Sequence, residues 1–470
     1  MLVVISDLHF EEERTDAIPE GGGLLPVAYS RNLPAKVFRS FINHLAQEAI
    51  RNQARSMDLV FAGDVFDLNR TSLWFRANQI NLRPYVNNKD VDGDLEEYIK
   101  KIVAQIQVEV EVGRSLGAFR LLAEGKYWDK VEKAFPIPVT LHFIPGNHDR
   151  LVNSTPAIRQ MVRQSLGLPG ADEPFPHFLT FPEEGVVVRH GHEYDRFNFS
   201  IDLSPETTIP FQIPDEAYDE PTFGDYATVD IAARIPYLFR RHHGDDRIRK
   251  DESLRTIYLR FLEFDDLRPQ RAMFNFLVNI PGRDIGPKVV WRAIEPIIYQ
   301  LLEELQDDPY LSTWLDKLDK EWRLDTIDVV QTALTLRSWR LAGIPLGLAQ
   351  FISNSIIAGR DDVPPASKLA AKETVIQSAD YRFLVAGHTH KPAVELIASD
   401  SKGERYYIDT GTWRNRLPAT PDYDGFGRLR ALTYVVFYGP NEDSGLEQLG
   451  RKVSSMNYWN GFTQRWYIKD

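Results

Sequence analysis

The stretch Leu2-Val3-Val4-Ile5-Ser6-Asp7-Leu8-His9 begins with a short apolar run and ends with two potential metal ligands. A run of four to six apolar, mostly β-branched residues is typical of a fully buried strand. In α/β sheets, ligands bind just outside the carboxyl ends of the strands. We therefore expect Asp7 and His9 to lie at the edge of a buried sheet, where chemistry takes place in this class of fold.

The same pattern recurs four more times along the chain. Six of the 11 histidines lie in the resulting five motifs. One such motif could be an ordinary turn, but five in one chain, each behind an apolar run, indicate a single shared site. The further motifs are Gly63-Asp64-Val65-Phe66-Asp67 after Leu59–Ala62, Gly146-Asn147-His148-Asp149 after Val139–Ile144, His190-Gly191-His192-Glu193 after Val186–Arg189, and Gly387-His388-Thr389-His390 after Phe383–Ala386.

The composition of the chain limits its domain number, its possible metal ligands and its classes of binding partner. The 470 residues suffice for two or three domains, or for one domain with large insertions. A net charge of -12 argues against a broad, non-specific nucleic-acid surface. Without cysteine there is no disulfide and no thiolate ligand, so a metal would be held by His, Asp, Asn or Glu. No apolar run is long enough for a membrane span and no basic leader precedes the first strand, so we expect a cytoplasmic protein.

Two long insertions separate the motifs. Segment 68–138 is expected to be helical, with a helix beginning at Asp94, and part of it is expected to stand over the cleft. Segment 196–380 is expected to be a mostly helical cap or accessory block. Segments 1–195 and 381–470 would form the catalytic core, the second through strands that build another sheet packed on the first. Those strands are expected at Val394–Ile397, Arg405–Ile408, Ala431–Phe437 and Phe462–Ile468.

The five motifs, in this order, resemble those of the calcineurin-like binuclear metallophosphoesterase superfamily. The motifs cover about thirty positions, the strands before them extend the resemblance to the catalytic unit, and neither insertion is covered. The resemblance implies an α/β fold, namely a four-layer αββα sandwich of two mixed sheets flanked by helices. It also implies two divalent metal ions at the edge of the paired sheets.

The metal ligands can be assigned on this basis. Two divalent ions about 3.5–4 Å apart need a bridging carboxylate. Asp64 is the natural bridge, because it is central in order and follows a glycine that lets the backbone approach closely. The resemblance agrees, and it implies that Asp7, His9 and His390 complete the first site while Asn147, His190 and His388 complete the second. Ligands of nitrogen and oxygen suit Mn, which we expect most, and also Fe, Ni or Zn.

The expected reaction is hydrolysis of a phosphodiester or phosphomonoester by a hydroxide held between the two ions, which attacks phosphorus in line. The resemblance makes His148 the general acid that protonates the leaving oxygen, oriented by Asp67. Asp149 could either brace its turn or take part in the reaction. His192 could contact substrate, support a ligand or simply pack. His44, His142 and His177 lie outside the motifs and are expected to be structural.

Several arginines are candidates for binding the substrate phosphate. Arg150 follows a motif, and Arg240 and Arg241 belong to a basic run in the second insertion. The alternative for that run is a solvated helix face. Arg414 and Arg416, at expected strand ends, are further candidates.

Alternative functions remain open at this point. The protein Ser/Thr phosphatase branch carries Arg directly after the second Asp of its Gly-Asp motif, whereas this chain has Leu68, which argues against a protein phosphatase. Gly387-His388-Thr389-His390-Lys391-Pro392 resembles the DNA/RNA nuclease branch. A third possibility is a binding or scaffold protein that engages a protein partner through its helical insertion. The favoured substrate is a phosphorylated small molecule, a nucleotide or an oligonucleotide.

Overall fold

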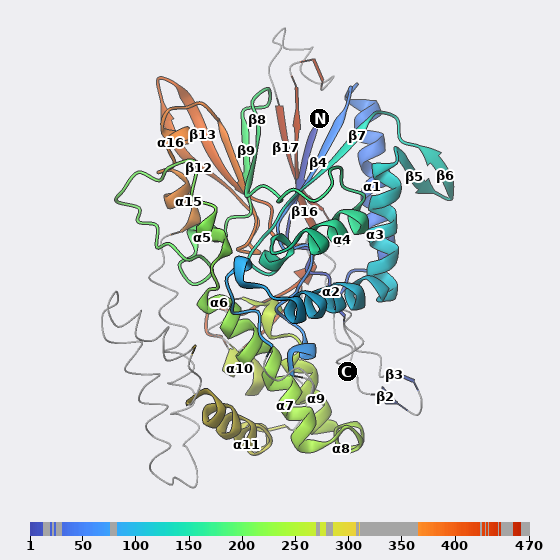
Figure 1. The fold of residues 1–470 in the computed structure, drawn as a ribbon, viewed down its shortest axis with the longest axis vertical. Helices are drawn as coiled ribbons and strands as arrows, with labels where there is room; N and C mark the ends of the chain where they lie inside the picture. The colour runs from blue at the N-terminus through green and yellow to red at the C-terminus, as the bar shows by residue number, and fades with distance from the viewer. Residues whose placement is uncertain are drawn as a thin grey trace.

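The protein is an α/β structure with two mixed five-stranded sheets and a helical block, as Figure 1 shows. Part of the second insertion, 311–364, and the expected strand Phe462–Ile468 lie outside the residues that the structure describes. The computed structural model describes residues 1–12, 19–20, 23–24, 31–75, 82–268, 273–278, 285–306, 310, 365–423, 425–427, 429–430, 432–439, 441–442 and 455–461.

The first sheet has the strand order β17-β16-β1-β4-β7. Its parallel centre consists of β1 (Leu2–Ile5), β4 (Met57–Ala62) and β7 (Val139–Ile144). The strands β16 (Leu432–Tyr438) and β17 (Ser455–Gly461) continue it in antiparallel orientation. The strands predicted before the first three motifs are therefore confirmed, and their carboxyl ends share one edge.

The second sheet has the strand order β12-β13-β11-β9-β8. It contains β8 (Phe178–Phe181), β9 (Val186–Arg189), β11 (Phe383–Ala386), β12 (Ala393–Asp400) and β13 (Gly403–Asp409). Here β11 runs parallel to both β9 and β13. The C-terminal strands were predicted to build another sheet packed on the first. In the structure only β12 and β13 belong to the second sheet, whereas β16 and β17 belong to the first.

One buried apolar cluster contains side chains from both sheets. Val4 and Val60 of the first sheet belong to it together with Val188 and Val385 of the second. Side chains alternate between the two faces of a strand, so the residues between them point the other way. Burial on both faces explains why these strands read as continuous apolar runs.

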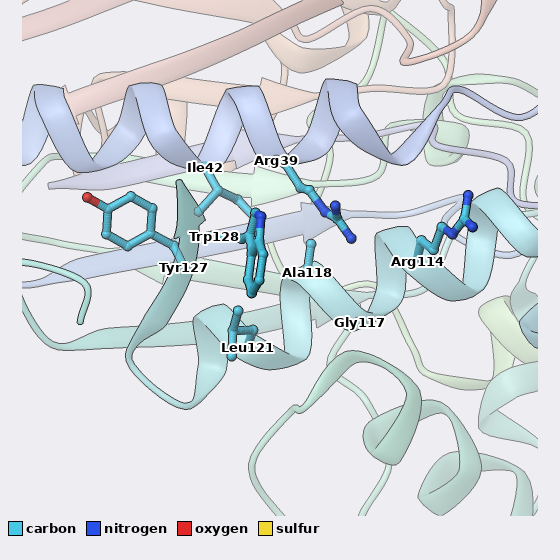
Figure 2. A pocket seen from close by; sticks show the side chains of 8 residues that line it. All are labelled: Arg39, Ile42, Arg114, Gly117, Ala118, Leu121, Tyr127 and Trp128. Atoms are coloured by element: carbon cyan, nitrogen blue, oxygen red, sulfur yellow. The ribbon is translucent and has the colours of Figure 1, made fainter. Parts of the chain in front are cut away.

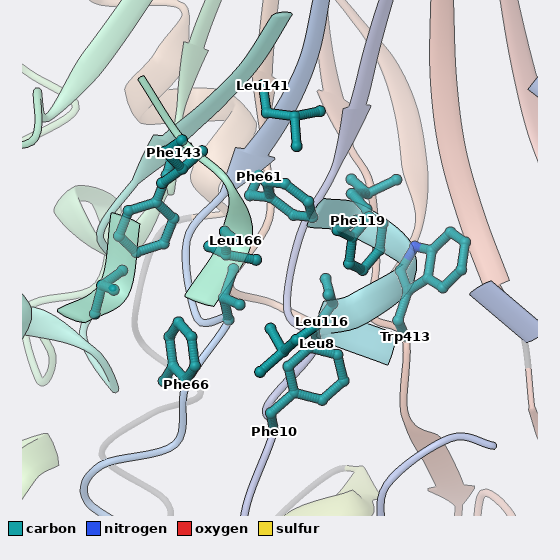
Figure 3. Packing of buried hydrophobic residues seen from close by; sticks show 14 of the residues in the cluster. Leu8, Phe10, Phe61, Phe66, Leu116, Phe119, Leu141, Phe143, Leu166 and Trp413 are labelled. Carbon is teal, nitrogen blue, oxygen red and sulfur yellow. The ribbon is translucent and has the colours of Figure 1, made fainter. Parts of the chain in front are cut away.

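The other face of the first sheet is covered by helices. Phe61 of β4 packs edge-on against Phe119 at a ring distance of 4.9 Å. Figure 3 shows this core, with Phe10 and Phe66 at its lower end in the view. The helices around it are α1 (Ala35–Arg51), α2 (Gly93–Val108), α3 (Val110–Ala123) and α4 (Pro156–Leu166).

The first insertion differs from the prediction in two respects. Its helix begins at Gly93 with Asp92 as the N-cap, rather than at Asp94, because the Asp92 carboxylate accepts the backbone N–H of Leu95. The helices α2 and α3 pack into the hydrophobic core below the first sheet. A hairpin of β5 (Lys126–Asp129) and β6 (Val131–Ala134) follows them and was not predicted.

A pocket of about 180 Å³ lies between α1, α3 and β5, as Figure 2 shows. None of its residues belongs to a motif, so this pocket is separate from the candidate site. Its lining consists of Arg39, Ile42, Arg114, Gly117, Ala118, Leu121, Tyr127 and Trp128.

The described part of the second insertion is mostly helical, as predicted, and much of it has a hydrophobic cluster of its own. Its helices are α5 (Glu216–Asp219), α6 (Phe223–Tyr226), the π-helix η7 (Ala227–Ala233), α7 (Arg234–His243), α8 (Asp245–Lys250), α9 (Glu252–Phe261), α10 (Met273–Val278) and α11 (Pro287–Gln306). The short helices α15 (Ala366–Ala370) and α16 (Thr374–Gln377) contribute instead to a cluster with Leu384 and Tyr407 of the second sheet.

Smaller elements complete the described chain. A three-stranded sheet joins β10 (Leu267–Arg268), β14 (Asn415–Pro418) and β15 (Leu429–Arg430), and β2 (Pro19–Glu20) pairs with β3 (Gly23–Leu24). Within the described ranges, no helix has both the length and the apolar character that a membrane crossing requires.

Candidate metal centre

The loops after β1 and β4 run side by side and carry the first two motifs. The backbone N–H of Asp7 donates to the carbonyl of Gly63 at 3.0 Å, and that of His9 donates to the carbonyl of Asp64 at 2.8 Å. Leu8, which separates Asp7 from His9 in the sequence, lies in the hydrophobic core that Figure 3 shows. Side chains of this loop thus point alternately into the core and into the site. Burial of the apolar Leu8 and Phe10 fixes the positions of the polar Asp7 and His9.

The first group of potential ligands consists of Asp7, His9 and His390. The Nε2 atoms of His9 and His390 are 2.9 Å apart, and His390 Nε2 lies 3.2 Å from Asp7 Oδ1. All three side chains are buried. Residues separated by most of the chain therefore direct three ligand atoms toward one point.

The second group lies around Asn147, His190 and His388. The Oδ1 atom of Asn147 is 3.2 Å from His190 Nε2 and 3.0 Å from His388 Nδ1. Asp64 lies between the two groups, because its Oδ2 is 3.2 Å from His190 Nε2 and 3.7 Å from His9 Nε2. This is the position that a bridging carboxylate would occupy.

The hydrogen bonds on the outer side of the ligand histidines fix their tautomers. His9 Nδ1 lies 3.1 Å from Asp67 Oδ2, and His190 Nδ1 lies 2.8 Å from the carbonyl oxygen of Ala62. Both oxygens are acceptors, so Nδ1 carries the proton in each ring. The lone pair of Nε2 then points into the cluster, as metal ligation requires.

His388 and Asn147 are oriented by residues that the motifs do not contain. His388 Nε2 lies 3.1 Å from Asp195 Oδ2, so the proton is on Nε2 and the lone pair of Nδ1 faces the cluster. Asn147 Nδ2 donates to Asn198 Oδ1 at 3.3 Å, which turns Asn147 Oδ1 toward the histidines. Sequence reasoning missed Asp195 and Asn198, and the only signal for them was their position just after the fourth motif.

A buried carboxylate oxygen provides a test of whether cations fit this site. Asp7 Oδ1 is buried and accepts no hydrogen bond, whereas Asp7 Oδ2 accepts from Ser6 Oγ and from the backbone N–H of His388. A buried carboxylate oxygen without a hydrogen-bond donor needs positive charge beside it, which here comes either from a protonated His390 at 3.2 Å or from a bound cation. With inward lone pairs from oxygen and nitrogen and no sulfur, the residues fit divalent ions of the Mn, Fe, Ni or Zn type.

The electrostatics of the cluster also call for positive charge. Burial alone would raise the pKa of Asp64, but the neighbouring charges of His190 and His148 lower it overall. Burial would lower the pKa of His190, yet the Asp64 carboxylate raises it to about 10. The buried carboxylates thus stabilise protons on nearby imidazoles, and bound cations would displace those protons.

His148 and Asp67 lie beside the ligands, as predicted. His148 Nδ1 is 2.9 Å from Asp67 Oδ1, and the backbone N–H of His148 donates to Asp64 Oδ1 at 2.9 Å. The ring packs edge-on against His9 at 4.8 Å, and 17% of the side chain is exposed. Asp67 therefore fixes the orientation of a ring that stays partly exposed beside the cluster.

The glycines in three motifs allow this close approach. A Cβ atom on Gly63 would overlap the ring of His190, and one on Gly146 would overlap the Asp64 carboxylate. A Cβ atom on Gly387 would overlap Ser6 and Asp7. Gly63 also has φ of +89°, a backbone conformation that L side chains rarely adopt.

Asp149 braces its loop. Its carboxylate accepts the backbone N–H of Gly146 at 2.5 Å, of Val65 at 2.8 Å and of Phe66 at 3.3 Å. Burial, reinforced by the charge of Asp64, raises the pKa of Asp149 to about 7. Of the two roles left open by the sequence, this geometry matches the structural one.

The structure does not bring Arg150 to the cluster in the way that a phosphate ligand would require. Its Nη1 donates to Asn88 Oδ1 and to the carbonyl of Asp219, both at 2.7 Å, and to the carbonyl of Val86 at 3.2 Å. Its Nη2 donates to the carbonyl of Pro84 at 3.0 Å. The buried guanidinium thus ties chain segments together, because a buried cation needs several acceptors.

Arg240 and Arg241 are also placed away from the motif residues. Arg240 forms a two-point ion pair with Asp245, with Nε–Oδ1 at 2.9 Å and Nη2–Oδ2 at 2.8 Å. Arg241 is exposed on α7. Figure 1 shows α7 and α8 in the helical block below the two sheets. This placement matches the solvated helix face that was the alternative for the basic run.

His192 and Arg414 both lie close to the cluster. His192 is buried beside His190 at a ring distance of 5.2 Å, and burial lowers the pKa of His192 to about 3. Arg414 is buried, with Nη1 3.7 Å from Asp67 Oδ2 and Nη2 3.2 Å from Glu11 Oε1. Arg414 therefore supports Asp67, while Arg416 is half-buried on β14.

The histidines expected to be structural lie outside both ligand groups. His142 pairs with Asp58 at 2.7 Å, and His177 stacks on Tyr218 at a ring distance of 3.7 Å. His44 packs edge-on against Tyr434.

Comparison of the chain with models of known protein families and with curated proteins gave no match. The interpretation of the site therefore depends on its own geometry and on the motif resemblance.

Proposed function

We propose that this protein is a two-metal phosphoesterase with the architecture of the calcineurin-like superfamily. The observation that carries the proposal is the pair of ligand groups, buried except for the partly exposed His388, on either side of Asp64. The apolar cluster between the sheets and the helices beside each sheet support the four-layer αββα arrangement.

The charge of the site matches a phosphate ester. Among the proposed ligands only Asp7 and Asp64 carry negative charge, so two divalent ions would leave a net charge of about +2 at the site. A phosphodiester monoanion would offset about half of this charge, and a phosphomonoester dianion would offset all of it. Two divalent ions bound there would supply an activated water and stabilise charge on the phosphoryl oxygens.

The side chains of the protein supply the proton transfer. Asp67 holds the Nδ1 proton of His148, so a second proton on the ring is carried by Nε2. A water that has released one proton to solvent forms the new P–O bond as hydroxide, the ester P–O bond breaks, and His148 transfers the Nε2 proton to the leaving oxygen before it takes up a proton from solvent again. Asp67 stabilises the imidazolium before the transfer and keeps the ring aligned afterwards.

The proposal is tested with metal-depleted protein that is reloaded with Mn²⁺. We expect Mn²⁺-dependent hydrolysis of p-nitrophenyl phosphomonoesters or phosphodiesters, and loss of both binding and turnover in Asp64→Asn. Asp202→Asn is the matched control, since it removes an exposed carboxylate outside the site. Wild-type protein that binds no Mn²⁺ and hydrolyses none of a panel of nucleotides, sugar phosphates and oligonucleotides would contradict the proposal.

A further inference from the structure

We propose that loop 195–198, at the start of the helical accessory block, controls the affinity of the second metal position alone and links its occupancy to the docking of helix α6. This inference rests on the proposed two-metal function and adds a means of regulating it. The second position is the one formed by Asn147, His190 and His388, with Asp64 shared.

Two ligands of the second position depend on this loop. Asp195 Oδ2 lies 3.1 Å from His388 Nε2, and Asn198 Oδ1 accepts from Asn147 Nδ2 at 3.3 Å. Asn198 Nδ2 also donates to Asp195 Oδ2 at 2.7 Å, so one network orients both ligands. The network fixes which atom of each ligand faces the cluster, which is what sets metal affinity in comparable sites.

The first position is supported from the catalytic core instead. Asp67 orients His9 at 3.1 Å. Asp7 is held through its carboxylate by Ser6 and by the backbone N–H of His388 at 3.0 Å, and through its carbonyl oxygen by Thr412 Oγ1 at 2.9 Å. None of these supports is donated by loop 195–198, and the contact from His388 is made by its backbone rather than by the ring that Asp195 orients, so a change in the loop should leave them in place.

Helix α6 forms contacts with the loop on one side and with Asn69 on the other. The backbone N–H of Gly224 donates to the carbonyl of Phe197 at 2.7 Å, and a Cβ atom on Gly224 would overlap Asn198 Oδ1. On the other side, Asn69 Nδ2 donates to Asp225 Oδ1 at 2.8 Å and lies 3.4 Å from the carbonyl oxygen of Asn147. Displacement of α6 would therefore disturb both the loop and Asn69, and both of these contact ligands of the second position.

The physical effect of losing the loop contacts differs between the two residues. Without Asp195, His388 is free to move its proton to Nδ1 and so lose the lone pair that faces the cluster. Without Asn198, the Asn147 amide is free to turn its NH₂ group inward. Loss of such supporting contacts typically lowers metal affinity by about 10–100-fold.

The experiment is a calorimetric Mn²⁺ titration of the full chain. We expect two binding events in wild type. In Asp195→Ala and Asn198→Ala, one event should weaken by about 10–100-fold while the other keeps its affinity. Asp195→Asn should give a smaller loss, because its amide oxygen still accepts from His388. Asp202→Asn, which removes an exposed carboxylate from the same segment, is the control and should match wild type.

Gly224→Ala tests the link to α6, because it changes no residue that contacts a ligand. We expect selective weakening of the same single event. By reciprocity, Mn²⁺ should slow hydrogen exchange across residues 195–226 in wild type more than in Asp195→Ala.

Equal weakening of both events, or no change in either, would overturn the inference, and circular dichroism of each variant identifies misfolding. Wild type that binds no Mn²⁺ refutes the proposed function instead, so the two failures are distinguishable.

Discussion

Replacement of His148 by Ala should reduce hydrolysis selectively for substrates with poor leaving groups. The ring is fixed by Asp67 at 2.9 Å and lies beside the cluster without belonging to the proposed ligands. Its removal therefore takes away a proton donor but leaves the ligand atoms in place. We expect Mn²⁺ binding to change little.

The expected loss of rate in His148→Ala follows from its proposed role as the general acid. Loss of a positioned general acid typically costs about 100- to 10,000-fold in rate, which corresponds to about 3–5 kcal/mol of barrier. That loss should appear in kcat for a phosphodiester whose leaving group is an unactivated alcohol. With p-nitrophenolate, which leaves without protonation, the loss should be about tenfold or less.

The assay compares kcat for the two leaving groups in wild type, His148→Ala and His142→Ala. His142 pairs with Asp58 on the first sheet, so its replacement controls for the loss of a histidine outside the site. Equal losses for both leaving groups would refute the acid role. A parallel loss of Mn²⁺ binding would show instead that His148 supports the metal centre.

Three further changes test other parts of the structure. Asp64→Asn should lower Mn²⁺ affinity at both positions by more than the 10–100-fold typical of supporting residues, as measured by calorimetry, because both positions share this carboxylate; loss at only one position would contradict a bridging role. Gly63→Ala should lower the free energy of unfolding by about 1–3 kcal/mol more than Gly125→Ala in urea denaturation, because both glycines have positive φ but only Gly63 faces a crowded ring; equal effects would contradict the steric argument. Burial lowers the pKa of His177 below 6.5, so the unfolded chain binds this proton more readily and stability is lost as pH falls below about 6.5. The melting temperature of wild type should therefore fall more between about pH 7.5 and 5.5 than that of His177→Phe, which keeps the stacking on Tyr218, and equal slopes would contradict this assignment.

The convergence of the five motifs could be read from the sequence because it depends on local patterns. Apolar runs indicate strands buried on both faces, and the residues after them lie at the carboxyl ends. Such runs do not say which strands become neighbours. The grouping of β16 with β1, and of β12 with β13, was therefore decided by packing that the sequence pattern does not contain.

Contacts made only in the folded chain account for what the sequence did not reveal. Asp195 and Asn198 are ordinary loop residues until His388 and Asn147 meet them across the fold. Arg150 resembles a phosphate ligand in sequence because it follows a motif. In the structure its guanidinium is taken up by backbone carbonyls, among them those of Pro84 and Val86, whose positions no local pattern specifies.

The backbone of the ligands carries an independent sign of function. Five of the nine described non-glycine residues with positive φ are proposed ligands, namely Asp7 (53°), His9 (47°), Asp64 (52°), His388 (71°) and His390 (58°). Each such conformation costs about 1–2 kcal/mol for an L residue. The same alternation of strained, relaxed and strained residues occurs in both Asp7-Leu8-His9 and His388-Thr389-His390.

This strain persists because the surrounding hydrogen bonds determine it. The Asp7 carbonyl accepts from the backbone N–H of Trp413 at 3.1 Å and from Thr412 Oγ1 at 2.9 Å, and the backbone N–H of Gly387 donates to the His190 carbonyl at 2.7 Å. A fold that only needed to be stable would place glycine or asparagine at such positions. Aspartate and histidine in this conformation lower the stability of the fold, but the conformation directs their side chains into the two ligand groups.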